Sequence, residues 1–246
     1  MSLGGRGILI TRPRELAEGL ARLVEAAGGG PIRFPSLEIV DLPAPQAFSR
    51  LEQFDRAIFV SPIAVRRAAK LARKWPPALR AMALGAGTRR ELEKLGLARV
   101  SAPQAGADSE ALLALPELEQ VAGERILIVR GEGGRGLLGE TLTARGASVE
   151  YAECYRRARP AADPAPLVAA WGRGEVDAVT VSSTEGLDSL FAMLGARGEP
   201  YLRATPLFVP HARVAERAGV LGVRHAIVGG PGDEETLARL VAYFAQ

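Results

Sequence analysis

Cysteine and histidine, two of the residues that most often bind transition metals, are nearly absent from this sequence. Its 246 residues include one cysteine, Cys154, and two histidines, His211 and His225. A single cysteine excludes an internal disulfide framework and fits a reducing compartment. Two histidines are too few for a histidine-rich metal site, and no zinc-protease, Cys-x-x-Cys or Walker motif is present. We therefore predict that the protein binds no metal.

Aromatic residues and long apolar runs are also scarce. Phe, Trp and Tyr make up 5% of the chain, whereas 48% of the residues are hydrophobic. This balance is typical of aliphatic helices packed on buried sheets. No apolar run approaches the roughly 20 residues that a membrane span needs, and the N-terminus has no signal-peptide pattern. We expect a cytoplasmic protein that does not bind a membrane.

Lysine occurs only three times, so arginine supplies almost all of the positive charge. The formal net charge is +3. Arginine is well suited to bind carboxylate or phosphate groups, although a codon bias towards arginine would give the same content. The basic residues are scattered and no zinc-finger spacing or RNA-binding motif is present, which argues against a nucleic-acid partner. The charge therefore permits an anionic ligand without requiring one.

Short aliphatic runs alternate with helical patterns along most of the chain. This alternation predicts parallel sheets with helices on both faces. About ten strands are too many for one compact sheet in a chain of this length, so we predict two sheets of about five strands. The predicted strands are Gly7–Thr11, Pro31–Phe34, Ala57–Val60, Met82–Leu84, Arg99–Val100, Ile126–Val129, Ser148–Glu150, Ala178–Val181, Leu207–Val209 and Ala226–Val228.

An internal repeat suggests how the two sheets divide the chain. The similar pairs are Ile8–Pro13 with Ile126–Gly131, Ala57–Ser61 with Ala178–Ser182, and Leu84–Gly96 with Leu207–Gly219. The Ile-Leu-Ile-x-Arg unit comes first in the chain, but its partner comes last in the middle segment. Tandem duplication does not give that order, whereas insertion of one domain into the other does.

We therefore predict an α/β fold of two flavodoxin-like, doubly wound parallel-sheet domains, one inserted in the other. Domain 1 spans residues 1–37 and 156–246, and domain 2 spans residues 38–155. The connecting segments Leu37–Leu42 and Ser148–Tyr155 both have extended patterns and predict a two-stranded linker. Two chain crossings make a hinge, and the cleft between two domains is the default place for a ligand.

The segment Gly131–Gly136 matches the Gly-x-Gly-x-x-Gly fingerprint of dinucleotide-binding folds. It follows a predicted strand, opens a helix, and is followed by Glu150 and Glu153, where such folds place a ribose-binding acid. However, this unit ends the middle domain instead of starting one, and its repeat partner lacks the glycines. A two-domain NAD(P)-binding oxidoreductase is thus an alternative, as is a hinged protein that binds a small ligand without chemistry.

Several strand-to-helix turns could still bind anions. Backbone N–H groups at a helix N-terminus bind carboxylates as well as phosphates. The turns are Ser61-Pro62, Gly85–Thr88, Gly131–Gly136, Ser182-Ser183 and Pro210-His211, all at the carboxyl ends of predicted parallel strands. Each Ser or Thr taken singly is the usual residue for a helix N-cap. Several such turns facing one cleft would form an anion-binding pocket.

An ordered set of motifs resembles the uroporphyrinogen-III synthase family. The motifs are Thr11-Arg-Pro13, Pro35-Ser-Leu-Glu-Ile39, Phe59-Val-Ser-Pro-Ile-Ala-Val65, Leu84-Gly-Ala-Gly-Thr-Arg-Arg-Glu-Leu92, Ile126-Leu-Ile-Val-Arg-Gly-Glu-Gly-Gly-Arg135 and Glu153-Cys-Tyr-Arg-Arg157. The similarity covers the whole chain. It implies a cofactor-free lyase that cyclises hydroxymethylbilane, with loss of water and inversion of ring D through a spiro intermediate. The product, uroporphyrinogen III, belongs to tetrapyrrole and heme biosynthesis.

The resemblance also implies the site. It assigns Tyr155, in the linker, as a proton donor to the departing hydroxyl, although a linker aromatic could equally pack the hinge. The proposed substrate-binding residues are Arg12, Ser61, Thr88, Arg130, Gly131, Gly133, Ser182, Ser183 and His211. Arg12 and Arg130 are equivalent in the repeat and could instead form structural ion pairs.

The turn Val209–Arg213 departs from the family pattern, because His211 stands where many members have a hydroxyl residue. His211 could replace that hydroxyl or could simply lie beside a helix cap. We expect a monomer whose partner is the small-molecule substrate, with a transient contact to the preceding enzyme of the pathway.

Overall fold

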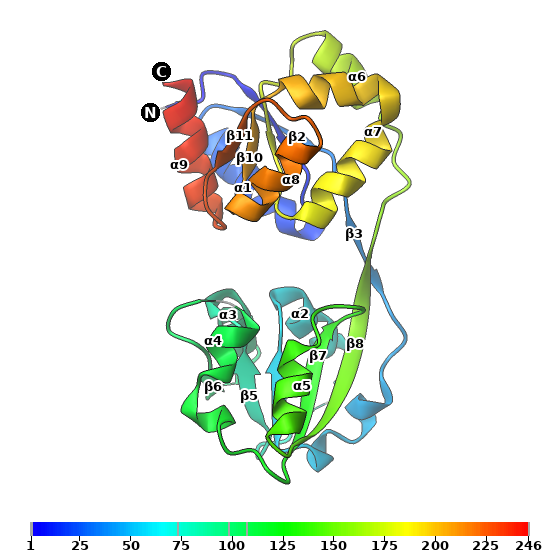
Figure 1. Cartoon of the computed structure of the whole chain (residues 1–246), viewed down its shortest axis with the longest axis vertical. Helices are drawn as coiled ribbons and strands as arrows, with labels where there is room; N and C mark the ends of the chain where they lie inside the picture. Colours follow the sequence, from blue (N-terminus) through cyan, green and yellow to red (C-terminus); the bar gives the residue numbers. More distant parts are fainter. Residues whose placement is uncertain (1, 73, 98, 107, 246) are drawn as a thin grey trace. The chain divides into compact units, whose positions relative to one another are not determined.

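The computed structural model describes residues 2–72, 74–97, 99–106 and 108–245. They form two compact units: unit 1 comprises residues 1–38 and 158–246, and unit 2 comprises residues 39–157. The repeat predicts domain boundaries after residues 37 and 155. The unit boundaries lie after residues 38 and 157, one and two residues further along the chain. The chain enters unit 2 along β3 (Glu38–Asp41) and leaves it at the end of β8 (Ser148–Ala158) (Figure 1).

Unit 1 contains a five-stranded sheet in the order β11-β10-β9-β1-β2. All of its strand pairs are parallel. Numbered along this unit alone, the order is 2-1-3-4-5, which is the flavodoxin-like arrangement. The strands are β1 (Gly7–Ile10), β2 (Gly30–Arg33), β9 (Ala178–Thr180), β10 (Leu207–Val209) and β11 (Ala226–Val228).

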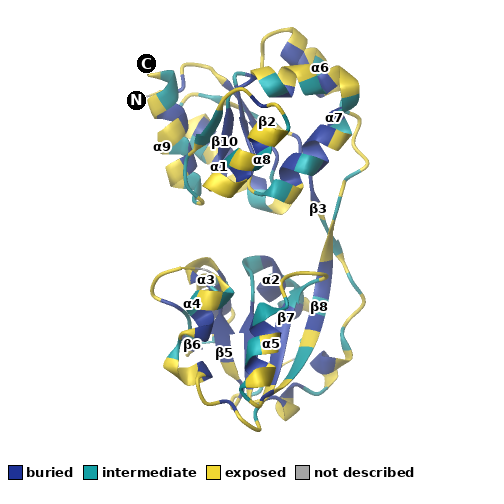
Figure 2. Ribbon diagram, in the orientation of Figure 1, coloured by how far each residue is buried: buried dark blue, intermediate teal, exposed yellow. Residues whose placement is uncertain are grey.

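Helices cover both faces of this sheet because neighbouring strand residues point to opposite sides. Ile8 and Ile10 pack with residues of α1 (Arg14–Ala26) and α9 (Asp233–Phe244). Leu9, between them, packs on the other face with residues of α6, α7 and α8. These helices span Ala165–Gly172, Thr184–Ala204 and Ala212–Val220, and α7 is kinked at Gly195, whose φ is 54°. Figure 2 shows the buried strands between partly exposed helices.

Unit 2 contains a six-stranded sheet in the order β3-β8-β7-β4-β5-β6. The pairs among β8, β7, β4, β5 and β6 are parallel. The remaining bounds are β4 (Arg56–Phe59), β5 (Arg80–Ala83), β6 (Val100–Ser101) and β7 (Arg125–Gly131). The sequence repeat pairs β7, β4 and β5 with β1, β9 and β10, and by their places in the sheets β8 and β6 correspond to β2 and β11. Equivalent strands therefore occupy equivalent places in both sheets, although the chain visits them in a different order.

Two features of this sheet differ from the strand pattern expected from sequence. The predicted strand Ser148–Glu150 and the extended linker segment after it form one strand of 11 residues, β8. The first linker segment is not only a connection, because β3 lies beside β8 as a sixth strand and the Leu42 N–H donates to the Cys154 carbonyl at 3.1 Å. Edge strands this short give little periodic signal in a sequence.

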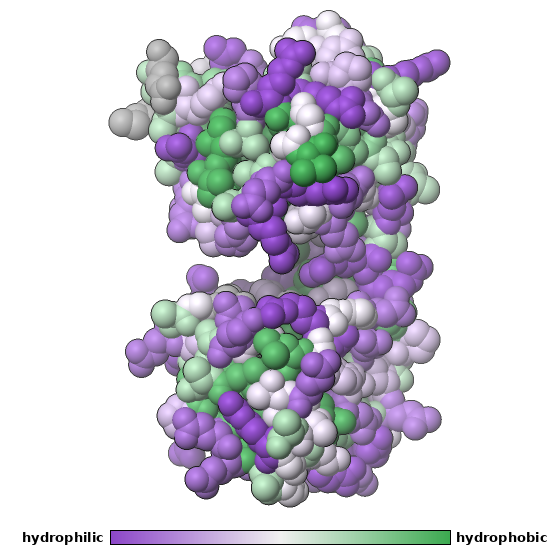
Figure 3. Space-filling view, in the orientation of Figure 1, coloured by the Kyte–Doolittle hydropathy of each residue, from purple (hydrophilic) through white to green (hydrophobic). Residues whose placement is uncertain are grey.

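The helices of unit 2 pack on both faces of its sheet. They are α2 (Pro62–Leu71), α3 (Ala86–Lys94), α4 (Ser109–Leu113) and α5 (Leu137–Ala144), with short 3-10 helices at Gln46–Ser49, Leu51–Gln53 and Pro116–Leu118. Ile58, Ile126 and Ile128 pack with Leu112 of α4 and Leu142 of α5 in one buried cluster. Hydrophilic side chains and smaller apolar areas alternate over the visible face of each unit (Figure 3).

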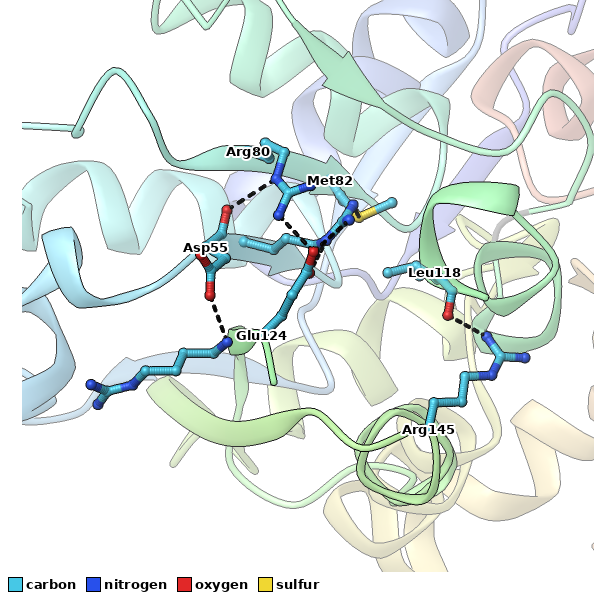
Figure 4. A network of polar contacts seen from close by, with 8 residues as sticks. Asp55, Arg80, Met82, Leu118, Glu124 and Arg145 are labelled. Atoms are coloured by element: carbon cyan, nitrogen blue, oxygen red, sulfur yellow. Dashed lines mark hydrogen bonds and ion pairs between the residues drawn. The ribbon is translucent and has the colours of Figure 1, made fainter. Parts of the chain in front are cut away.

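An ion network joins residues at the amino ends of three strands of unit 2, β4, β5 and β7 (Figure 4). Arg56, at the start of β4, is 5% exposed, and its Nη2 donates to Glu124 Oε1 at 3.0 Å. Arg80, at the start of β5, donates to the same oxygen at 2.8 Å. Asp55 accepts the Arg125 backbone N–H at 2.8 Å, where β7 begins. The Arg56 hydrogen bond is the main cause that lowers the pKa of Glu124, although burial opposes it.

Candidate functional site

Each sheet has a topological switch point where its crossover connections diverge. In unit 1 the switch point lies between β1 and β9, and in unit 2 between the equivalent strands β7 and β4. Open α/β sheets bind ligands beyond the carboxyl ends of the strands at such points. Thr11 and Arg12 follow β1, Val181 and Ser182 follow β9, Val60 and Ser61 follow β4, and Glu132 follows β7. We therefore built each candidate site from these ends.

Two hydroxyl groups meet at the switch point of unit 2. The Oγ of Ser61 and the Oη of Tyr155 lie 3.0 Å apart. Ser61 is the N-cap of α2, and its Oγ also accepts the Ala64 backbone N–H at 3.0 Å. Tyr155 is only 3% exposed, whereas Ser61 is half-buried. A buried phenol and a more accessible serine hydroxyl thus form one hydrogen-bonded pair.

A β-bulge in β8 directs Tyr155 towards Ser61. Along the β7–β8 ladder Arg130 pairs with Glu153, but the next residue, Gly131, pairs with Tyr155. The extra residue is Cys154, so Cys154 and Tyr155 are both buried although they are neighbours in a strand. Bulges of this kind redirect a side chain from its expected face. Burial also raises the pKa of the Cys154 thiol to about 12, which keeps it protonated at neutral pH.

Gly131 leaves room for the tyrosine ring. A β-carbon on Gly131 would stand 2.6 Å from Cε2 and 2.7 Å from Cζ of Tyr155. The backbone strengthens this arrangement, because the Glu132 N–H donates to the Tyr155 carbonyl at 2.7 Å. The first glycine of the Gly-x-Gly-x-x-Gly segment therefore accommodates an aromatic side chain of the same unit.

The rest of the glycine loop is organised around Arg130. Its guanidinium donates to the carbonyls of Gly131, Gly134 and Arg135 at 3.3 to 3.4 Å. It also lies 3.3 Å from a Glu153 carboxylate oxygen and 4.6 Å from the centre of the Tyr151 ring. Gly133 and Gly134 have φ values of 69° and 132°, which allow this turn. Arg130 therefore holds the loop in shape, as one of the two alternatives for this residue predicts.

The acidic residues that could have bound a ribose are engaged elsewhere. Glu150 accepts two hydrogen bonds from Arg50, at 2.9 and 3.0 Å. Glu153 pairs with Arg130. At the start of α5, the carboxylate of Glu140 lies where a β-carbon on Gly136 would be. Side chains of the same unit thus lie against Gly131, Gly134 and Gly136, which disfavours the dinucleotide alternative.

Thr88 lies one strand further from the switch point. It is buried in the first turn of α3, which follows β5 and has Gly85 at its N-cap. A β-carbon on Gly87 would stand 3.7 Å from Cγ of Pro62, so the starts of α2 and α3 lie close together. Thr88 thus belongs to the same carboxyl edge of the unit 2 sheet as Ser61.

In unit 1, Arg12 forms an ion pair with Asp233 at the start of α9. Both side chains are largely buried, and a β-carbon on Gly19 would collide with the Asp233 carboxylate. Arg12, Thr180 and Thr236 line a small cavity with room for about one water molecule. The equivalent arginines of the repeat, Arg12 and Arg130, are therefore both engaged in contacts within their own units.

Sequence analysis missed a chain of buried hydroxyl groups beside this pair. Thr180 donates to the Leu9 carbonyl at 3.1 Å, and Thr11 donates to the Thr180 carbonyl at 2.8 Å. Ser36 then donates to the Thr11 carbonyl at 3.2 Å, and Ser189 donates to the Ser36 carbonyl at 2.6 Å. These bonds fasten the carboxyl ends of β1 and β9 to the segment after β2 and to α7. The available signal was Thr11 at the end of the predicted strand Gly7–Thr11 and Thr180 one residue before the end of Ala178–Val181.

The remaining predicted residues lie at helix starts of unit 1. Ser183 is the N-cap of α7 and accepts the Gly186 N–H at 3.0 Å, whereas Ser182 before it is exposed. His211 occupies the N-cap of α8, and its exposed side chain makes no capping hydrogen bond. Ser182 and Ser183 thus lie at the switch point, and His211 lies at the end of the next strand.

Among residues 2–72, 74–97, 99–106 and 108–245, no group of three or more His, Cys, Asp or Glu side chains could hold a metal ion. Within the same ranges, no helix has the combination of length and apolar character required to cross a bilayer.

Fold and site together define an α/β protein of two doubly wound units, one inserted in the other, with hydroxyl and arginine side chains at the switch points. Residues 18–239 match the family model described as uroporphyrinogen-III synthase HemD. The chain belongs to the uroporphyrinogen-III synthase family, which catalyses the cyclisation step of tetrapyrrole synthesis. The resemblance inferred from the sequence motifs is confirmed.

Individual relatives support the same assignment. The chain is 38% identical to uroporphyrinogen-III synthase of Salmonella typhimurium over 241 residues, covering 94% of this chain and 98% of the relative. The Escherichia coli enzyme is 35% identical with the same coverage. Among solved structures, uroporphyrinogen III synthase of Thermus thermophilus aligns with a TM-score of 0.63 at 22% identity, covering 98% of this chain and 99% of that one. The Helicobacter pylori structure aligns with a TM-score of 0.64 at 14% identity, covering 97% and 99%, and supports the fold.

Proposed function

We propose that this chain converts hydroxymethylbilane, a linear tetrapyrrole with eight carboxylates, into uroporphyrinogen III. The hydroxyl group leaves one end of the bilane as water, which gives an azafulvene. The α-carbon of ring D that already carries the bridge to ring C attacks to form a spiro intermediate; the old bridge bond then breaks and reforms at the free α-carbon, which leaves ring D inverted. Without control of this geometry the bilane cyclises to the uninverted type I isomer.

The observation that carries the proposal is the Ser61–Tyr155 pair at the switch point of unit 2. Loss of hydroxide needs a proton, and this pair can supply one where an α/β sheet binds its ligand. The bilane is already reactive, so the enzyme has to supply positioning more than strong acid–base catalysis. Tyr155, the more acidic hydroxyl of the two, is the proposed proton source.

The other site residues are proposed to bind the substrate carboxylates. The hydroxyls of Thr88, Ser182 and Ser183 and the backbone amides of Gly131 and Gly133 supply hydrogen-bond donors at the carboxyl ends of the strands. Arg130 contributes by shaping the glycine loop, as its three bonds to loop carbonyls indicate. Arg12 and His211 are proposed to add positive or polar character on the side of unit 1.

The bilane cyclises spontaneously, so a transient contact with the enzyme that makes it would limit its loss to the type I isomer. We include this contact in the proposal. Size-exclusion or cross-linking experiments with the bilane-producing enzyme, with and without its substrate, would detect it.

An isomer assay tests the proposed function. Hydroxymethylbilane is generated in situ, the protein is added, and the oxidised products are separated by chromatography into type I and type III uroporphyrin. We expect mostly type III isomer in proportion to protein concentration. Type I isomer at the rate of a protein-free control, from a sample shown to be folded, would overturn the proposal.

A further inference from the structure

The two hydroxyl groups of the Ser61–Tyr155 pair differ in what surrounds them. The Tyr155 phenol is almost completely buried, and Ser61 is its only hydrogen-bond partner in the part of the chain that the structure describes. The Ser61 hydroxyl belongs to a half-buried residue and already accepts the Ala64 N–H at 3.0 Å. Each hydroxyl has one proton to donate and two lone pairs to accept with.

Burial determines which hydroxyl donates to the other. If Ser61 donated to Tyr155, the phenolic proton would be left in a buried position with no acceptor, which is costly. If Tyr155 donates to Ser61, the phenol is satisfied. The Ser61 oxygen then uses both lone pairs, one for the Ala64 N–H and one for the phenol. Its own proton must then be donated to a third group.

Resting on the proposed function, we infer that Ser61 is the catalytic residue that touches the substrate and that Tyr155 acts through it as a positioning residue and proton reservoir. The Ser61 O–H donates to the hydroxyl oxygen of the bilane as its C–O bond breaks, and the bonding electron pair leaves with that oxygen as water. Ser61 takes the phenolic proton of Tyr155 in the same step. The pyrrole N–H proton released as the azafulvene forms returns through the Ser61 hydroxyl to the phenolate, so the step is balanced.

The surroundings of Tyr155 agree with this order. The ring lies against Gly131, and the bulge at Cys154 places the phenol behind the start of α2, where Ser61 caps the helix. The N-cap holds the Ser61 oxygen in a fixed position relative to α2, whereas a side chain on a flexible loop would have to be ordered first. The relay is therefore built from two rigid elements, α2 and β8.

The proposed order of proton transfer, from Tyr155 to Ser61 and from Ser61 to the substrate, predicts which variant loses more activity. Ser61→Ala removes the group in contact with the substrate, so we expect kcat for type III formation to fall by about 100-fold with little change in KM. Tyr155→Phe leaves the Ser61 hydroxyl able to donate, so we expect a smaller loss, of about tenfold. The double variant should be no slower than Ser61→Ala, because groups that act in series are not additive.

Solvent isotope effects give a readout that loss of packing would not change. A plot of the wild-type rate against the fraction of D2O in the solvent should be curved, because two protons move in one step. The same plot for Tyr155→Phe should be straight, because only one proton then moves in the step. Ser61→Thr keeps both the hydroxyl and the cap and should retain most of the activity and the curvature.

The controls separate this inference from folding and from the proposed function. Asp108 caps α4 by accepting the Ala111 N–H at 2.8 Å and has no tyrosine partner among the residues that the structure describes, so Asp108→Ala loses a cap in the same unit and should keep full activity. If Ser61→Ala does not fold, Ser61→Gly replaces it, since glycine is a cap only slightly weaker than serine. A greater loss in Tyr155→Phe than in the Ser61 variants, or losses that multiply in the double variant, would overturn the relay. Wild-type protein that makes no type III isomer would instead overturn the proposed function.

Discussion

The α-carbon of Gly131 faces the ring of Tyr155 so closely that a methyl group there would stand 2.6 Å from Cε2. Gly131 is paired with Tyr155 across the β7–β8 ladder, immediately after the bulge. The position of the Tyr155 phenol therefore requires a glycine at residue 131. The hydrogen bond between this phenol and Ser61 depends on the same glycine.

Replacing Gly131 by alanine should move Tyr155 away from Ser61. We expect Gly131→Ala to lose type III formation to at least the extent of Tyr155→Phe and to lower the free energy of unfolding by about 1–3 kcal/mol through overpacking. Isomer analysis and urea titration measure the two effects. Gly219→Ala, in α8 with nothing within 4 Å of the new methyl group, is the matched control and should keep both activity and stability. Normal activity in Gly131→Ala would contradict the proposed position of the phenol.

The Glu124 network should make stability depend on pH. The folded-state pKa of Glu124 is lowered, chiefly by Arg56, so its contribution is present above the unfolded pKa of about 4.5 and is lost as pH falls below it. Glu124→Gln should cost about 1–2 kcal/mol at pH 7, and the difference from wild type should shrink below pH 4.5. Urea titrations from pH 7 to pH 3 measure this. Glu175→Gln, at an exposed pair with Arg173, should change little, and an equal loss there would refute the network's special role.

The Arg12–Asp233 pair can be tested for a second role in substrate binding. Single variants Arg12→Met and Asp233→Asn should each destabilise unit 1, and the double variant should show a coupling energy of about 0.5–3 kcal/mol. If Arg12 also binds a substrate carboxylate, KM should rise further in Arg12→Met than in Asp233→Asn. Equal KM values in the two variants would assign Arg12 to the ion pair alone.

Cys154 should be unreactive in the folded protein. Burial raises the pKa of its thiol to about 12, so at pH 8 the reactive thiolate is rare as well as inaccessible. We expect iodoacetamide to label Cys154 only after unfolding in urea, as measured by intact mass. Rapid labelling of the native protein would show that the bulge of β8 opens in solution.

NAD and NADP should not stabilise the protein. Arg130 and Glu140 occupy the glycine loop, and Glu150 and Glu153 are paired with arginines. A ligand that binds the folded state raises the melting temperature by mass action. We expect no change in Tm at millimolar cofactor. A clear increase would restore the dinucleotide alternative.

Much of the architecture was predictable because the sequence repeats itself. Ile8–Pro13 comes first in the chain, whereas the similar segment Ile126–Gly131 comes last in the middle segment, which predicts equivalent strands that the chain visits in a different order. The sheet orders of both units have this property. Short continuous aliphatic runs predicted the strands, because neighbouring residues such as Ile8 and Leu9 are buried on opposite faces of one sheet.

The details of the site were less predictable. Ser61 and Tyr155 are 94 residues apart in the chain, and their contact depends on an extra residue, Cys154, that no local pattern identifies. The glycine fingerprint was misleading in isolation, because Gly131 makes room for a ring and not for a phosphate. Arg130 is directed to loop carbonyls by a turn of two positive-φ glycines, which only the folded backbone reveals.

The pairing of β3 with β8 brings the beginning and the end of unit 2 together. The Leu42 N–H reaches the Cys154 carbonyl at 3.1 Å, so the two points where the chain enters and leaves this unit lie on neighbouring strands. A segment whose ends meet in this way can be spliced into a loop of another fold without distorting either. The same closure means that new termini could be opened elsewhere in unit 2 once its old ends were joined.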